Sequence, residues 1–200
     1  MSVAALALLT GCAAGLVVDR DRPAIELSEV PFFPQNRYQC GPAALATVLV
    51  ASGVDITPDR LVPEVYLPSR RGSLQIELQA AARRHGRLPY ELAPDLEVLL
   101  DTVTTGMPVL VLQNLGFSWL PRWHYGVVVG YDPGRSAVLL RSGRERRRAE
   151  PVGRFQRTWS LAGRWAVVAL RPGEIQATAS PSTDLETVVA AGAALAPDSI

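Results

Sequence analysis

The stretch Gln35-Asn36-Arg37-Tyr38-Gln39-Cys40-Gly41-Pro42-Ala43-Ala44-Leu45 is the part of this sequence that decides the fold. Its cysteine is followed by a glycine, a proline and then small and apolar residues that recur at helical spacing up to Ser52. Proline suits an early helical position, because its missing N–H needs no partner there. We therefore predict a helix over residues 41–52, with Cys40 at its amino end.

A cysteine at the amino end of a helix is placed to act as a nucleophile. The partial positive charge of that end stabilises a thiolate, which predicts a lowered pKa for Cys40. Gln35 lies five residues upstream, so its side-chain amide could join the Cys40 backbone N–H in stabilising the oxyanion of a tetrahedral intermediate. Gly41 would let a substrate backbone approach. An isolated cysteine is more often a small buried core residue, and these neighbours favour the reactive interpretation.

The base that such a thiol needs must be one of two histidines. His85 follows two arginines at a predicted helix end and precedes Gly86, where a solvated histidine near the last carbonyls is the usual arrangement. His124 instead opens an apolar run over 124–131, typical of a buried strand, and could meet the amino end of a helix. We expect His124 to be the base; its alternative role is a core histidine with a satisfied hydrogen bond.

The remaining pattern predicts helices in the first half of the chain and strands in the second. Helices are expected at 58–66, at 74–85 with Ser73 as its cap, and at 94–105. Strands are expected at 90–92, 109–113, 124–131, 137–141 and 165–170, with a hairpin turn at 132–135. Helices followed by an antiparallel sheet indicate an α+β fold.

Gln35, the run 40–45 and the run 124–132 together resemble the C39 and C39-like peptidases. Residues 72–73 and 106–111 also resemble family segments, and the resemblance spans about residues 30–171. It implies a papain-like fold in which Cys40, at the start of a helix, packs on an antiparallel sheet that carries His124. It further implies a cysteine peptidase that hydrolyses peptide bonds in a peptide or protein substrate and needs no cofactor.

In the family pattern, a third catalytic residue, an aspartate at the end of the next strand, orients the imidazole through Nδ1. This sequence departs from that pattern. That place reads Leu140-Arg141-Ser142-Gly143 here. Asp132 lies about 26 Å along the extended strand from His124, at about 3.3 Å per residue, and cannot reach it. The hairpin brings Ser142 back beside His124, so Ser142 Oγ or a backbone carbonyl is the expected orienting group. A neutral partner should weaken the Cys⁻/His⁺ pair.

Three functions follow from this departure. The first is peptide hydrolysis, the second is binding of a peptide without cleavage, and the third is acyl transfer in which an amine resolves the intermediate. Four arginines at 144 and 146–148 are predicted to form a solvated loop, with contact to an acidic substrate or a lipid headgroup as the alternative.

The amino-terminal segment 1–18 is apolar apart from Ser2, Thr10 and Cys12, and it resembles a targeting segment. Leu9-Thr10-Gly11-Cys12 resembles a bacterial lipobox, which predicts cleavage before Cys12 and lipidation of its thiol, although no basic residue precedes the apolar run. Alternatives are a transmembrane anchor or a generic apolar start. We expect a signal peptide at 1–11, a lipidated cysteine and tether at 12–29, the peptidase domain at 30–171 and a tail at 172–200, in which residues 184–195 could form a short helix.

The predicted lipoprotein would carry palmitate-type acyl chains and lie in the bacterial cell envelope, on the outer membrane facing the periplasm. Lipidation of Cys12 would leave Cys40 without a disulfide partner. The chain has 20 basic and 19 acidic residues, a net charge of +1, which argues against a nucleic-acid partner. No metal-ligand spacing of cysteines and histidines and no phosphate-binding loop occurs, so neither a metal nor a cofactor is expected, and the oligomeric state is left open.

Overall fold

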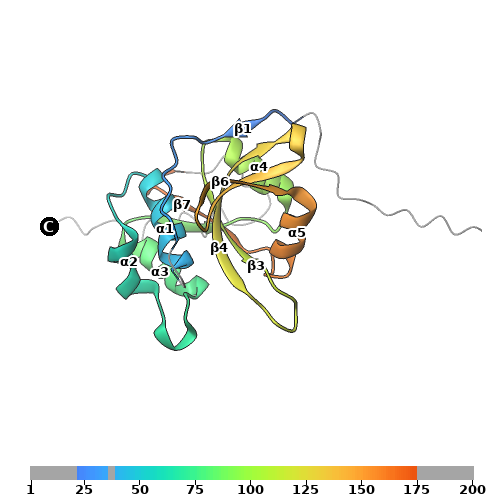
Figure 1. Ribbon diagram of the computed structural model, residues 1–200. Helices are drawn as coiled ribbons and strands as arrows, with labels where there is room; N and C mark the ends of the chain where they lie inside the picture. The colour runs from blue at the N-terminus through green and yellow to red at the C-terminus, as the bar shows by residue number, and fades with distance from the viewer. Residues whose placement is uncertain (1–21, 36–38, 175–200) are drawn as a thin grey trace, which may run out of the picture.

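The computed structural model describes residues 22–35 and 39–174. The predicted signal peptide, the lipidation site at Cys12 and the predicted tail helix at 184–195 lie outside these residues. Within them the chain forms one antiparallel sheet with helices on both of its faces (Figure 1). The predicted α+β class, with a helical first half and an antiparallel sheet, is confirmed.

The helices are interleaved with the early strands and precede most of the sheet. They are α1 (Cys40–Ala51), α2 (Pro58–Val65), α3 (Gln75–Arg84), α4 (Leu96–Thr104) and α5 (Val152–Ser160), with short 3-10 turns η1 (Pro68–Arg70) and η2 (Pro133–Arg135). The strands are β1 (Ile25–Glu26), β2 (Leu88–Glu91), β3 (Val109–Asn114), β4 (Trp123–Asp132), β5 (Ala137–Ser142), β6 (Glu145–Pro151) and β7 (Ala166–Leu170). The strand order is β2-β7-β3-β4-β5-β6, and β1 pairs with the end of β4.

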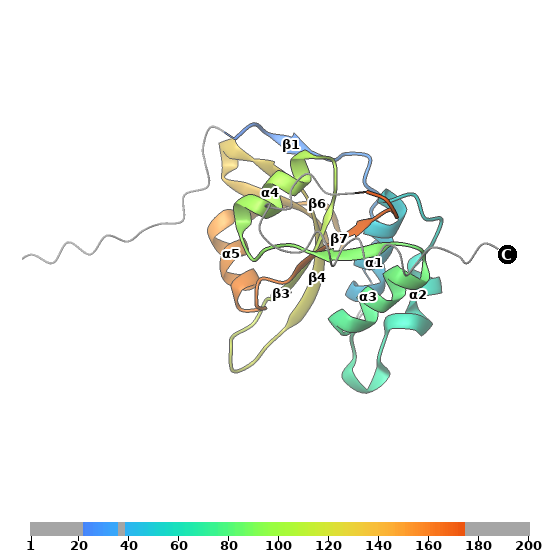
Figure 2. The ribbon, with the colours of Figure 1, turned by 180° about the vertical axis from the view of Figure 1, so that it is seen from behind.

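Two hydrophobic cores lie on opposite faces of the sheet. The helices α1, α2 and α3 cover one face, and α4 and α5 cover the other, as the two opposite views show (Figures 1 and 2). Side chains alternate between the faces along a strand, so Leu110 and Leu112 of β3 join the first core while Val109 and Val111 join the second. Burial of both faces explains why β3 is apolar from Val109 to Leu112 without interruption.

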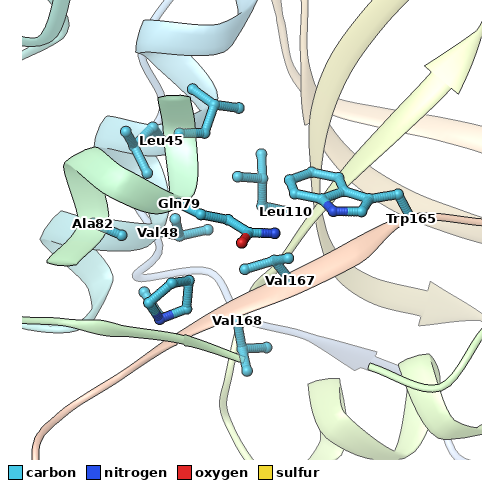
Figure 3. Close-up of a pocket in the computed structure, with 11 residues that line it drawn as sticks. Leu45, Val48, Gln79, Ala82, Leu110, Trp165, Val167 and Val168 are labelled. Carbon is cyan, nitrogen blue, oxygen red and sulfur yellow. The ribbon is translucent and has the colours of Figure 1, made fainter. Parts of the chain in front are cut away.

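A small cavity of about 10 Å³ lies in the first core, between α1, α3 and the sheet, and holds a single water at most. Figure 3 shows the side chains around it, which come from both helices and from β3, β7 and the residue before β7: Leu45, Val48, Gln79, Ala82, Leu110, Trp165, Val167 and Val168. Close packing on this side holds α1 rigidly against the sheet.

Two elements were not expected from the sequence. Strand β6 contains Arg146–Arg148, so the prediction of a solvated loop there is wrong and holds only for Arg144 in the turn. This strand lies at the edge of the sheet, where charged side chains are common because they discourage pairing with other chains. The helix α5 has a recognisable signal, because Phe155 and Trp159 are spaced four residues apart and both are buried.

The folded domain begins before residue 30, where the sequence analysis placed the end of a tether. Residues Ile25 and Glu26 pair with Tyr131 and Gly130 of β4. Arg141, which is only 3% exposed, donates through Nη2 to the Leu27 carbonyl at 3.2 Å and through Nε to the Val30 carbonyl at 3.3 Å. These contacts secure the segment 25–30 to β4 and β5.

The amino end of α1 depends on the glycine that follows Cys40. A Cβ built on Gly41 would lie 2.6 Å from Ser73 Cβ, and closer still to Ser73 Oγ. The sequence analysis assigned Gly41 to the approach of a substrate backbone, whereas the structure places the Ser73 side chain there. The glycine therefore allows the segment before α3 to pack against the start of α1.

We predict that Gly41→Ala lowers the free energy of unfolding by about 1–3 kcal/mol, because the added methyl group overpacks a filled site. Urea denaturation measures this change. Gly153→Ala is the matched control: it lies in α5 with no atom within 4 Å of the new Cβ, so it should be neutral or stabilising. The double variant Gly41→Ala/Ser73→Gly should recover part of the loss. Equal stability of Gly41→Ala and wild type would contradict this account.

Candidate active site

One open cleft brings together three of the residues predicted from the sequence. Gln35, Cys40 and His124 all line it. Cys40 is the first residue of α1, and His124 is the second residue of β4. The cleft has a volume of about 1240 Å³, which is above the usual range of roughly 300–1,000 Å³ for small-molecule pockets. Its size suits a segment of extended chain.

The Cys40 thiol is partly buried and is not in a disulfide. Burial raises its pKa, and hydrogen bonds from the backbone N–H groups of Tyr125, Gly41 and Cys40 itself reduce this rise without reversing it. The prediction of a lowered pKa is therefore wrong for the free protein. Removal of the sulfur from water outweighs the stabilisation of a thiolate by the helix end.

The His124 imidazole is neutral at physiological pH. Burial, followed by the positive charges of Arg148 and Arg122, lowers its pKa to about 4. A neutral imidazole can accept a proton, which a general base must do. Because the thiol also keeps its proton at neutral pH, the free site holds a neutral thiol and a neutral imidazole. The predicted weakness of the Cys⁻/His⁺ pair agrees with this state, although burial and the two arginines are its main causes.

Ser142 lies beside His124, as the hairpin geometry predicted. Its Oγ is 2.8 Å from His124 Nε2, and the serine side chain is buried. The contact uses Nε2, not the Nδ1 that the family pattern suggested, so Nδ1 is the nitrogen left for the thiol. Asp132 accepts a hydrogen bond from the Arg135 backbone N–H at 3.1 Å, at the far end of β4. The oriented histidine thus contacts a hydroxyl and not a carboxylate.

Gln35 is held between the β5–β6 turn and β4. Its backbone N–H donates to the Gly143 carbonyl at 2.8 Å, and its side-chain Oε1 accepts from the Gly143 N–H at 3.0 Å. Its Nε2 donates to the Tyr125 carbonyl at 3.2 Å. An amide nitrogen carries two hydrogens, so one of them remains available for a substrate oxygen.

The second histidine, His85, is not among the cleft residues. Its Nε2 lies 3.0 Å from Glu64 Oε1, and its side chain is half-buried between α2 and α3. The expectation of a freely solvated His85 is therefore wrong, because a glutamate of the neighbouring helix pairs with it. Its exclusion from the site agrees with the choice of His124 as the candidate base.

The described residues contain no group of three or more histidine, cysteine, aspartate or glutamate side chains arranged to hold a metal ion. No helix among residues 22–35 and 39–174 is long and apolar enough to cross a membrane.

Residues 27–167 match the family model described as the Peptidase_C39 like family. The chain belongs to this family. The match covers Gln35, the helix α1 that carries Cys40, and the strand β4 that carries His124. This C39-like chain begins its family match within three residues of β1, in agreement with the earlier start of the folded domain.

Solved structures of other proteins share the fold of this C39-like domain. A protein described as a C39-like peptidase from Bacillus anthracis is 18% identical, with a TM-score of 0.62 over 76% of this chain and 100% of that one. A double glycine motif protease from an AMS/PCAT transporter, solved with its leader peptide, is 19% identical, with a TM-score of 0.56 over 74% and 98%. The peptidase domain of Streptococcus ComA, a bifunctional ABC transporter, is 20% identical, with a TM-score of 0.55 over 71% and 98%.

These identities support a common fold and no more. A search of curated proteins finds no match for the C39-like chain.

Three arginines of the cleft were missed by the sequence analysis. Arg70, Arg71 and Arg122 line it together with Arg144. They carry no motif, because they lie in connections that give no periodic signal. The only signal was their position: Arg70 and Arg71 directly precede Gly72-Ser73, and Arg122 lies two residues before His124.

We predict that His124 titrates with a pKa of about 4. Arg122→Gln should raise this pKa, because removing a nearby positive charge favours the protonated imidazole. Proton NMR of the imidazole C2–H over a pH series measures it, with His85→Gln used to assign the two signals. Arg157→Gln, on the exposed side of α5, should leave the value unchanged. Titration of His124 near its ordinary value of 6.5 would contradict the prediction.

Proposed function

We propose that this protein is a cysteine peptidase in which Cys40 is the nucleophile, His124 the general base and Gln35 an oxyanion donor. The observation that supports this most is that all three residues line one cleft, although they come from separate segments of the chain. Membership of the C39-like family supports the same chemistry. A similar solved structure contains a leader peptide, which supports a peptide or protein substrate for this chain.

The reaction starts from neutral groups in this proposal. Cys40 Sγ attacks the peptide carbonyl while Nδ1 of His124 takes the thiol proton, so charge separates only as the new C–S bond forms. The Cys40 backbone N–H and the second hydrogen of Gln35 Nε2 then stabilise the negative oxygen. His124 gives its proton to the leaving amine. Water next hydrolyses the thioester with His124 as base, which releases the carboxylic acid and restores the thiol.

Ser142 has the role of a positioning residue in this scheme. In the tautomer that this scheme requires, Nε2–H donates to the Ser142 hydroxyl oxygen, which leaves Nδ1 unprotonated and free to take the thiol proton. A hydroxyl stabilises the imidazolium less than a carboxylate would, so turnover is expected to be slow. Peptide binding without cleavage is the second candidate function, and the raised pKa of Cys40 is the observation that favours it.

We predict that a peptidyl chloromethyl ketone alkylates Cys40 at least tenfold faster in the parent than in His124→Ala, since a positioned general base typically contributes about 10²–10⁴-fold. The parent for this measurement is the full chain with Cys12→Ser, so that Cys40 is its single thiol. His85→Ala is the matched control and should alkylate at the parent rate. Intact-protein mass spectrometry gives the rates. Equal alkylation rates in the parent and in His124→Ala would overturn the proposed peptidase activity and leave peptide binding without cleavage as the function.

We also propose that the protein is lipid-anchored in the bacterial envelope, on the outer membrane facing the periplasm. The basis is the sequence 9–12, which resembles a lipobox at the end of an apolar run. Acyl chains on Cys12 would hold the domain at the membrane, since each buried methylene contributes about 0.8 kcal/mol.

We predict that protein purified from bacterial envelopes begins at a diacylated Cys12. Mass spectrometry of the amino-terminal peptide measures its mass, and Cys12→Ser should remove both the lipid and the cleavage because the modified thiol is absent. An amino-terminal peptide that retains residues 1–11 in the wild-type protein would overturn the anchor.

A further inference from the structure

The cleft that holds Cys40 and His124 is lined by positive charge. Arg70, Arg71, Arg122 and Arg144 are among its lining residues, and none of the described residues that line it is an aspartate or glutamate. Arg70 and Arg71 belong to the connection between α2 and α3, Arg122 directly precedes β4, and Arg144 lies in the β5–β6 turn. Figure 1 shows the α2–α3 and β3–β4 connections extending toward the same end of the molecule. The charge therefore surrounds the cleft from three separate segments.

These four arginines differ from most other arginines of the domain in having no anionic partner. All four are exposed, and within residues 22–35 and 39–174 none of their guanidinium groups makes a hydrogen bond or an ion pair. Elsewhere several carboxylates pair with arginines: Glu26 with Arg147 at 2.6 Å, Glu64 with Arg84 at 3.0 Å, and Glu97 with Arg22 at 2.6 Å. The cleft is thus locally cationic although the net charge of the whole chain is nearly neutral.

A group of unpaired guanidinium ions in a concave site attracts anions. Low-dielectric walls concentrate the field of like charges and raise the local concentration of an oppositely charged ligand. Guanidinium is planar and presents paired donors that match a carboxylate. Mutual repulsion among the arginines is relieved when an anion binds, so the cleft gains most from a ligand with several negative groups.

We propose that the cleft selects peptide segments that carry aspartate or glutamate side chains close to the bond presented to Cys40. The proposal rests on the peptidase function above and names its substrate class. An extended acidic chain fits better than a single phosphate, because the arginines come from three segments around a cleft of about 1240 Å³. Leu74 and Trp123, which are 37% and 56% exposed, also line the cleft and would contact apolar side chains of the same peptide.

Binding of an acidic substrate would also change the basicity of the His124 imidazole. The positive charge of Arg122 is one of the causes that lower the pKa of His124. A carboxylate bound against Arg122 offsets that charge and makes the imidazole a stronger proton acceptor. The base would then be strongest when the preferred substrate is bound.

Binding to an inactive protein tests the selection separately from catalysis. The probes are three fluorescein-labelled decapeptides in which leucine alternates with glutamate, glutamine or lysine, and the protein is the full chain with Cys40→Ala and Cys12→Ser. Fluorescence anisotropy at low ionic strength should show the glutamate peptide binding about tenfold more tightly than the glutamine peptide, since each exposed charge pair contributes modestly. The preference should shrink with added salt.

Single substitutions identify the residues that carry this preference. Arg70→Gln, Arg122→Gln and Arg144→Gln should each reduce it about two- to fivefold, in the range of one exposed ion pair. Arg157→Gln removes the same charge from an exposed position on α5 outside the cleft and should leave it unchanged.

Two outcomes would overturn the selection. One is equal binding of the glutamate and glutamine peptides at low ionic strength. The other combines two results: the glutamate peptide is not preferred, and the protein sediments with vesicles of phosphatidylcholine and phosphatidylglycerol. If Arg122→Gln abolishes that sedimentation, the cleft would be assigned to lipid headgroups. Failure of the alkylation test alongside tight binding of the glutamate peptide would remove the peptidase and leave the acidic-peptide cleft.

Discussion

The burial of α1 is the constraint on which the rest of the structure depends. Every residue from Gly41 to Leu49 is buried, so this helix is enclosed by the sheet on one side and by α2 and α3 on the others. Such a helix cannot rotate or slide without opening the core. Its first residue, Cys40, therefore has a fixed position, and His124 is fixed in turn because β4 packs directly against α1. Packing thus sets where Cys40 and His124 lie, and the hydrogen bond with Ser142 orients the His124 ring.

The same packing sets the protonation states of Cys40 and His124. Partial burial raises the pKa of Cys40 and lowers that of His124, so both groups become neutral for one physical reason. The positive charges of Arg148 and Arg122 lower the pKa of His124 further, in the same direction as burial. The cleft therefore holds a neutral thiol and a neutral imidazole and no preformed ion pair.

The sequence was sufficient for the features that local patterns encode. Helix α1, strands β3 to β5 and the turn at Asp132 follow from periodicity and turn residues, and Ser142 follows from counting along a hairpin. The lowered pKa expected for Cys40 failed because desolvation depends on how deeply the helix start is buried, which one sequence does not reveal. Arg70, Arg71 and Arg122 were missed for a related reason, because they meet Arg144 at the cleft only through tertiary structure.

The double contact between Gln35 and Gly143 ties the β5–β6 turn to the cleft that holds Cys40 and His124. Gly143 adopts a φ of 62° and exchanges two hydrogen bonds with Gln35, so the turn and the amide must move as one body. The neighbouring residue is Arg144, which reaches into the cleft. In the proposed mechanism, contact with a substrate side chain at Arg144 and placement of the Gln35 amide are therefore mechanically linked. A substitution at this turn that changes the proposed selectivity would then also displace the proposed oxyanion donor.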